Sequence, residues 1–166
     1  GATLTMAYQN DGGAASVEES YTDFAIAVSP EAIEGLTVGY ASSDNQTGVS
    51  IDQNKTTMYA KYAMGAFTVG VQSSDLDHTT ANSDQESTAY GITYAVNDDI
   101  SIGYSYHEVD FELASLSDQE STGISASYTM GGMTLAGATN EVDNRAGSSN
   151  AASDIEGYEF TLSFAF

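Results

Sequence analysis

The feature that most constrains this chain is a two-residue alternation of large apolar with small or polar side chains, which recurs along the whole sequence. The last run, 157–166, places large side chains at every even position from Tyr158 to Phe166. Because successive side chains of a strand point to opposite faces, such a run predicts a β-strand with one bulky and one small face. Roughly ten such runs are present, at 2–9, 21–29, 36–43, 56–64, 67–74, 87–96, 100–108, 121–130, 133–140 and 157–166.

The small face of these predicted strands decides the fold class. Its residues are mostly Gly, Ser, Ala and Thr with few charges. In the run 67–74, for example, Thr68 and Gly70 belong to the small face, and Phe67 and Val69 belong to the bulky face. The inward residues of a soluble β-sandwich must fill a packed layer, and its outward residues are typically charged or rich in Thr. A small, weakly charged face instead suits a water-filled interior, and a bulky face suits lipid. We therefore predict an all-β fold, a single antiparallel transmembrane β-barrel segment over residues 1–166 without separate domains.

The predicted connections alternate between short and long. Outer-membrane barrels have short turns on the periplasmic side and long loops on the outside. Most acidic residues here belong to the long connections or their flanks, and the tyrosines of the bulky face sort into two belts near the two strand ends. Aromatic belts of this kind are typical of a membrane-spanning protein. The short connections lie at 29–35, 64–66, 96–99 and 130–132, and the long ones near 9–20, 43–55, 73–87, 108–121 and 140–156.

The charge of the chain excludes one class of partner. The sequence has 24 acidic and 3 basic residues, a formal net charge of −21. A polyanion gains nothing from phosphate contacts, so nucleic acid is not expected to bind. The chain also has no cysteine, which excludes disulfides and cysteine metal sites.

A few residues on the small face are candidates for the pore lining. Lys61 is the only basic residue predicted within a strand, and its neighbours Ala60 and Tyr62 belong to the bulky face. A lysine on the lipid face near the midplane would cost about 2 to 4 kcal/mol, so Lys61 is expected to face water. The alternative is that it reaches the interface at the short turns along its alkyl stem. The pore-lining candidates are Asp23, Lys61, Gln72, Thr93, Ser105, His107 and Glu159.

Catalytic chemistry has little support in the sequence, and no catalytic residue is assigned. His107 is close in sequence to Glu108 and Asp110, which leaves open a hydrolase at the rim of a barrel that activates water with an acid and a histidine. No nucleophile elbow, phosphate-binding glycine loop or His/Cys metal cluster is present in the sequence.

Calcium is the one ligand for which the acidic segments offer candidates, and no other cofactor is expected. Carboxylates from flexible loops supply the oxygen ligands that calcium prefers, although none of these segments has the EF-hand spacing. The alternative is a solvated acidic surface that attracts diffuse counterions. The candidate ligands are Asp75, Asp77, Asp84, Glu86, Glu108 and Asp110.

The end of the chain resembles the C-terminal signature of Gram-negative outer-membrane proteins, which in that family is recognised by the barrel-assembly machinery. The residues that carry this resemblance are Tyr158, Phe160, Leu162, Phe164 and Phe166. Together with the segments "AMGAFTVGVQSSD", "AYGITYAVNDDISIGYSY" and "YTMGGMTLAGATN", they make the chain similar to the C-terminal part of an alphaproteobacterial general diffusion porin.

This resemblance implies a barrel of sixteen strands, of which these would be the last ten, and a homotrimer in contact with outer-membrane lipid and lipopolysaccharide. The start "GATLTMAYQND" fits this expectation, because it looks like the exit from a short periplasmic turn. A complete ten-stranded barrel remains the alternative, since an even number of strands permits closure.

The expected function is a passive, non-enzymatic pore for ions and small hydrophilic solutes in the bacterial outer membrane, with a preference for cations from its carboxylates. Two alternatives from other classes stay open. One is a soluble or surface-attached β-sandwich or adhesin that binds calcium, and the other is the outer-membrane rim hydrolase around His107.

Overall fold

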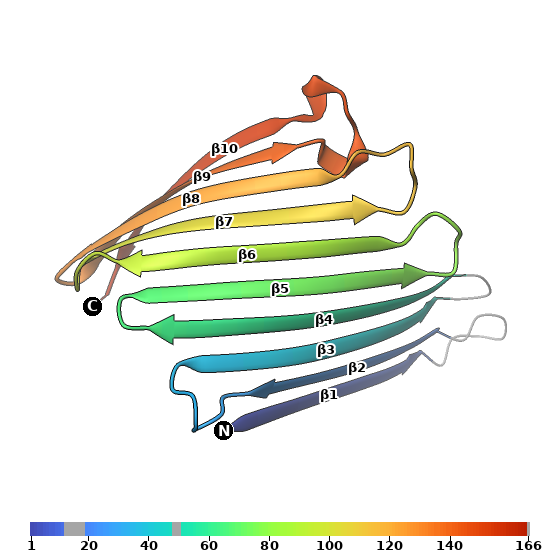
Figure 1. Ribbon diagram of the computed structural model, residues 1–166, viewed down its shortest axis with the longest axis horizontal. Coiled ribbons are helices and arrows are strands. Elements are labelled where there is room, and N and C mark those ends of the chain that lie inside the picture. The colour runs from blue at the N-terminus through green and yellow to red at the C-terminus, as the bar shows by residue number, and fades with distance from the viewer. Residues whose placement is uncertain (12–18, 48–50, 166) are drawn as a thin grey trace.

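The computed structural model describes residues 1–11, 19–47 and 51–165, and in these it shows ten strands joined in chain order into one antiparallel sheet (Figure 1). This confirms the all-β antiparallel prediction, and a single sheet contradicts the alternative of a two-layered sandwich. The strands are β1 (Ala2–Asp11), β2 (Glu19–Val28), β3 (Leu36–Thr47), β4 (Ile51–Met64), β5 (Phe67–His78), β6 (Gln85–Ala95), β7 (Ile100–Phe111), β8 (Gln119–Met130), β9 (Met133–Asp143) and β10 (Ile155–Phe164).

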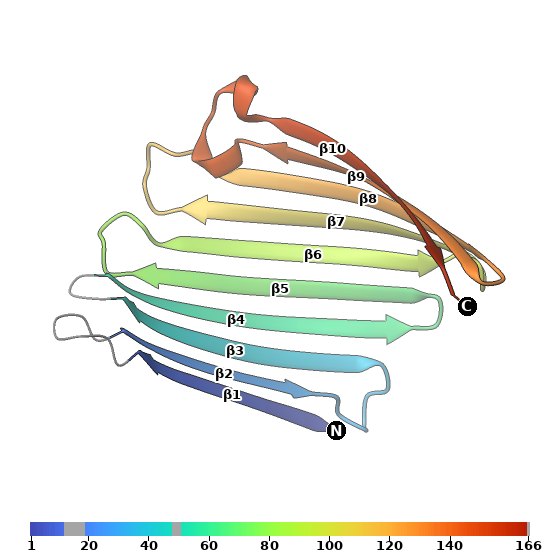
Figure 2. The same ribbon diagram turned by 180° about the vertical axis from the view of Figure 1, so that it is seen from behind.

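The sheet is curved and open, with β1 and β10 at its two edges. Figures 1 and 2 show β8, β9 and β10 bending away from the flatter part of the sheet, and they place both chain ends on the side of the short turns. Every strand pairs with its neighbour in sequence, so the sheet is a continuous meander of hairpins within the described residues.

The cross-strand register gathers the large side chains on one face, which we call the outer face, and the small ones on the opposite inner face. On the outer face, Phe67 lies beside Tyr94 with ring centroids 4.6 Å apart, and Tyr90 lies beside Tyr106 with centroids 5.0 Å apart. Both pairs are stacked, and aromatic pairs of this kind stabilise neighbouring strands.

No hydrophobic side chain is buried among the residues that the structure describes. Large apolar side chains are exposed along the whole outer face, for example Ile92, Ile124 and Leu135. A sheet in water would gain nothing from this arrangement, because folding removes no apolar face from solvent. The apolar surface that replaces a core therefore has to be covered by something other than this part of the chain.

The strands extend further towards the long connections than the hydrophobic alternation predicts. β5 continues to His78, β6 begins at Gln85 and β7 continues to Phe111, so that four carboxylates predicted beyond the strand runs, Asp75, Asp77, Glu86 and Asp110, lie in strands together with Glu108. The prediction that they sit in flexible loops is wrong, because backbone pairing continues beyond the apolar band. The backbone ladder needs only hydrogen-bond partners, whereas the alternation reports where the environment changes.

Three of the four short connections contain a glycine with positive φ, namely Gly35, Gly65 and Gly131. Gly65 and Gly131 occupy the first position of two-residue turns with φ of 58° and 60°, the conformation that tight hairpins favour. These turns keep β4 beside β5 and β8 beside β9 in the register that separates the two faces.

The connection between β9 and β10 contains two short 3-10 helices, η1 (Arg145–Gly147) and η2 (Ala151–Ser153), and it docks against the connection between β7 and β8. The Ser117 amide donates to the Gly147 carbonyl at 2.9 Å, and the Asn144 side-chain amide donates to the Asp118 carbonyl at 3.0 Å. None of the helices in the described ranges is long and apolar enough to cross a membrane.

Candidate functional site

The inner face is a polar wall whose hydroxyl groups pair across neighbouring strands. Thr57 and Ser74 hydroxyls lie 2.9 Å apart, and Ser101 and Ser127 hydroxyls lie 2.8 Å apart. A hydroxyl has one donor and two acceptor sites, so each pair keeps further hydrogen-bonding capacity for water. The wall is therefore wettable without being strongly charged.

The register places the predicted pore-lining residues on this inner face, but in separate regions of it. Lys61, Gln72, Ser105 and His107 lie close together on β4, β5 and β7. Asp23 lies on β2 in a hollow of about 240 Å³, and Glu159 lies on β10 in one of about 320 Å³. Thr93 pairs with Gly103. The two acids are thus not brought together with Lys61, and a role in lining a pore stays a prediction for all seven.

Lys55 is a functional candidate that the sequence prediction missed. β4 begins at Ile51, so Lys55 is a strand residue, and it shares the alternation of Thr57, Tyr59 and Lys61 on the inner face. It lines the same hollow as Asp23. The statement that Lys61 is the only basic strand residue is therefore wrong, and extending the predicted run 56–64 by one residue would have found Lys55.

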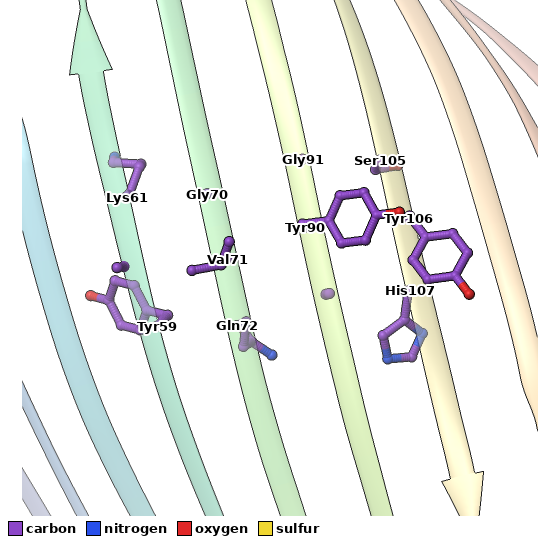
Figure 3. Close-up of a pocket in the computed structure, with 12 residues that line it drawn as sticks. Tyr59, Lys61, Gly70, Val71, Gln72, Tyr90, Gly91, Ser105, Tyr106 and His107 are labelled. Carbon is purple, nitrogen blue, oxygen red and sulfur yellow. The ribbon is translucent and has the colours of Figure 1, made fainter.

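One hollow on the inner wall has a volume of about 370 Å³ and a floor of two glycines (Figure 3). Gly70 of β5 and Gly91 of β6 are cross-strand neighbours, and the same row continues to Lys61 on one side and Ser105 on the other. The adjacent row, one step towards the long connections, consists of Tyr59, Gln72, Ala89 and His107.

Glycine also decides the position of Tyr59, which is one of the few large side chains on the inner face. A Cβ atom at Gly39, its cross-strand partner, would lie 2.1 Å from the Cε1 atom of the Tyr59 ring. The ring therefore lies over Gly39, in the space that any other residue would fill. This position directs the phenol towards β3 and leaves the floor of the hollow open.

The catalytic hypothesis for His107 is not supported by the geometry. Glu108 and Asp110, the acids expected beside it, have the opposite parity on β7 and belong to the outer face. The Glu108 carboxylate instead accepts a hydrogen bond from the Tyr106 hydroxyl. The sheet thus separates the imidazole from the carboxylates that the hydrolase mechanism needs.

His78, the other histidine, has a local role in the connection after β5. Its Nδ1 atom accepts a hydrogen bond from the Thr80 amide at 3.0 Å, and its own amide donates to Asp84 Oδ1 at 2.7 Å. Asp84, a predicted calcium ligand, therefore stabilises this turn through its carboxylate.

The other predicted calcium ligands lie on the outer parity of β5, β6 and β7. Asp75, Glu86 and Asp110 are neighbours across three strands, and Asp77 follows Asp75 on β5. Within the described ranges, no group of three or more His, Asp or Glu side chains is arranged to hold a metal ion. The carboxylates therefore form a band on the outer face, nearer the long connections than the tyrosines Tyr90 and Tyr106.

The predicted assembly signal lies on the outer face of the edge strand β10, apart from Phe166, which is outside the described residues. The exposed fractions of Tyr158 and Phe160 are 83% and 76%, and Leu162 and Phe164 are also exposed. The Phe160 ring packs over Gly137 of β9. The recognition of these residues by an assembly machinery stays a prediction.

Residues 1–147 match the family model described as Gram-negative porin. The chain belongs to this family. The predicted family is confirmed, and family membership places the porin in the bacterial outer membrane.

Two solved structures have the same fold as this porin. The anion-selective porin from Comamonas acidovorans aligns over 100% of this chain and 56% of its own, with a TM-score of 0.83 and 14% identity. The outer-membrane OmpT of Vibrio cholerae aligns over 89% of this chain and 56% of its own, with a TM-score of 0.62 and 13% identity. The porin chain thus spans just over half the length of each neighbour. A search of curated protein sequences finds no significant match.

Proposed function

We propose that this porin chain forms part of a passive, non-enzymatic pore through which ions and small hydrophilic solutes cross the outer membrane, with a preference for cations. The observation that carries the proposal is the division of the sheet into a large apolar face and a small polar face without any buried hydrophobic side chain in the described residues. Lipid on one side and water on the other satisfy both faces, and a water-filled lumen is what a pore requires.

The two open edges support the proposal that these strands are one segment of a larger barrel. β1 and β10 each pair on one side only within the described residues, and an unpaired edge within lipid leaves backbone groups without partners. Further strands would pair with the backbone groups of both edges. The expected sixteen-stranded barrel of the homotrimer contains such strands. Direct pairing of β1 with β10 would instead give a ten-stranded barrel.

Intact mass separates these two architectures. A detergent extract of outer membranes should contain a protein as long as the solved neighbours, of which this chain spans 56%. Light scattering of the same extract should give three copies per particle. A monomer with the mass of these 166 residues would support the ten-stranded alternative.

The preference for cations is supported by the position of the carboxylates. The acidic band, which includes Asp75, Glu86 and Asp110, lies at the strand ends that lead into the long connections. The whole sequence has 24 acidic and 3 basic residues. A negative potential at a pore mouth raises the local concentration of cations and lowers that of anions. The anion selectivity named for the Comamonas porin belongs to a protein of 14% identity, with which this chain shares the fold.

The reversal potential across a planar bilayer in a KCl gradient tests this preference. The native porin should give a potential of the sign set by potassium, and the triple variant D75N/E86Q/D110N should move it towards the chloride side. The matched variant D75E/E86D/D110E keeps the charges and should behave like the native protein. A native reversal potential on the chloride side would show that the proposed preference is wrong.

Contact with lipopolysaccharide and with the barrel-assembly machinery completes the proposal. The outer face of β10 offers an unbroken series of aromatic and aliphatic side chains at an open edge, which is a suitable surface for strand addition by another protein.

A further inference from the structure

We propose that the glycine-floored hollow on the inner wall of β4–β7 is a binding subsite for small hydroxylated organic anions of the sugar-acid type. This inference rests on the proposed pore, because only a lumen gives solutes access to the inner wall. The hollow is lined by Lys61, Gly70, Gln72, Gly91, Ser105 and His107, with Tyr59 at its border.

The two floor glycines are not required by the backbone. Neither Gly70 nor Gly91 is among the residues with positive φ. A Cβ atom at Gly70 would meet nothing closer than the Ala60 carbonyl oxygen at 3.8 Å, and one at Gly91 would lie 3.4 Å from the Tyr104 carbonyl oxygen. Glycine weakens a strand interior, and it often marks a place where a ligand approaches the backbone. Here the glycines leave an open floor that alanine or valine would fill.

The groups around this floor favour an anion. Lys61 lies directly beside Gly70, and no carboxylate lines the hollow. Asp23 and Glu159 line other hollows, and the acidic band has the outer parity. The hollow therefore presents positive charge to the lumen of a strongly acidic protein. An ammonium group beside an open floor attracts a carboxylate or phosphate group.

The remaining groups favour hydroxyls on the same ligand. Ser105 lies opposite Lys61 across the two glycines, and Gln72 and His107 follow in the adjacent row. Hydroxyl, amide and imidazole groups donate and accept hydrogen bonds, as sugar hydroxyls do. The volume of about 370 Å³ is within the range of small-molecule pockets, and it accommodates a monosaccharide-sized solute.

An open subsite of this kind holds a solute only briefly, which suits permeation. Conduction needs a site that is attractive enough to be entered and weak enough to be left. The subsite would thus raise the local concentration of sugar acids in a pore whose mouth favours cations. This assigns a second solute class to the inner wall, besides the ions selected at the rim.

The test compares three probes of similar size and different charge on single channels of the native porin in planar bilayers. Gluconate should interrupt the potassium chloride current, whereas glucose and the cation N-methylglucamine should do so much less. Lys61→Gln should weaken the gluconate effect up to about fivefold, the upper end of the range for one exposed ion pair. Lys55→Gln is the matched control, because it removes the same charge from the same strand outside the hollow.

A second pair of variants tests the floor. Gly70→Val should abolish the gluconate effect by filling the hollow, while the potassium chloride current persists. Gly157→Val is its control, since Gly157 lies on the inner face of β10 with nothing within 4 Å of an added Cβ. Equal effects of Lys55→Gln and Lys61→Gln, or equal interruption by gluconate and glucose, would overturn the inference.

Saturation-transfer NMR of gluconate with the detergent-solubilised porin separates this inference from the proposed function. If the native porin binds gluconate but conducts no current, and Lys61→Gln and Gly70→Val lose this binding, the pore is contradicted and the subsite is supported. Current without such binding would contradict the subsite and leave the pore standing.

Discussion

At the scale of single residues, glycine determines the shape of the inner wall. Gly39 accommodates the ring of Tyr59, whereas Gly70 and Gly91 leave their space empty. The sequence shows all three as small positions in strands, and it cannot distinguish a glycine that is filled by a neighbour from one that stays open. That distinction depends on the register across β3 to β6, which only the folded sheet defines.

Gly39→Ala should destabilise the folded porin by about 1 to 3 kcal/mol, because the new methyl group overlaps the Tyr59 ring and forces it to move. Urea unfolding in lipid vesicles measures the change in free energy. Gly157→Ala, in open space on β10, should have little effect. Adding Tyr59→Ser to Gly39→Ala should remove most of the penalty, and an undiminished penalty in this double variant would contradict the contact.

At the scale of the strand, hydrophobic alternation predicts which face each residue occupies better than it predicts where the strand ends. The faces and the short turns of β4, β5, β8 and β9 agree with the sequence prediction. The ends differ, because pairing continues beyond the apolar band into segments such as 75–78 and 108–111, where acidic residues take the outer parity in place of large apolar ones. Lys55 was missed for this reason.

Cysteine labelling tests the alternation of β4 against a natural background without cysteine. A charged, water-soluble thiol reagent added to porin in lipid should modify Tyr59→Cys and Lys61→Cys on the inner face. Met58→Cys and Ala60→Cys on the outer face should be protected by lipid, and they should react once the protein is unfolded. Equal labelling of neighbouring positions in the folded porin would show that β4 does not separate water from lipid.

The docked connections between β7 and β8 and between β9 and β10 form an element that the alternation does not predict. Gly147 has a φ of 76°, and a Cβ atom there would lie 2.8 Å from Leu116 Cβ. Gly147→Ala should therefore loosen this contact and speed proteolysis within 144–154 several-fold. The unfolding midpoint of the sheet should change little. Gly1→Ala, where an added Cβ meets nothing within 4 Å, serves as the control.

At the scale of the whole molecule, the bilayer takes the place of a core. The described strands expose apolar side chains on one side and have no second layer to bury them against. The family match identifies that environment as the outer membrane. Fold class could be predicted from the sequence because the small face and the bulky face repeat in every strand. The separate hollows could not be predicted, because each is lined by residues from four strands.

A charge placed on the outer face should measure the contribution of lipid directly. Ile92→Arg should cost about 2 to 4 kcal/mol of folding free energy in bilayers, because Ile92 lies between Tyr90 and Tyr94 on the lipid side of β6. Thr93→Arg, one residue further on the inner face, should cost much less. Similar losses for the two variants, measured by urea titration in vesicles, would contradict the assignment of the faces.

The meander topology makes the hairpin the natural unit of change in this architecture. Within the described ranges, each strand forms its backbone ladders only with its neighbours in sequence. A hairpin can therefore be duplicated, lost or exchanged without repacking any interior, because every neighbouring contact is renewed at the same strand spacing. The circumference of such a wall, and with it the width of the passage, can change in steps of two strands, while each hairpin keeps its own inner-face and outer-face side chains.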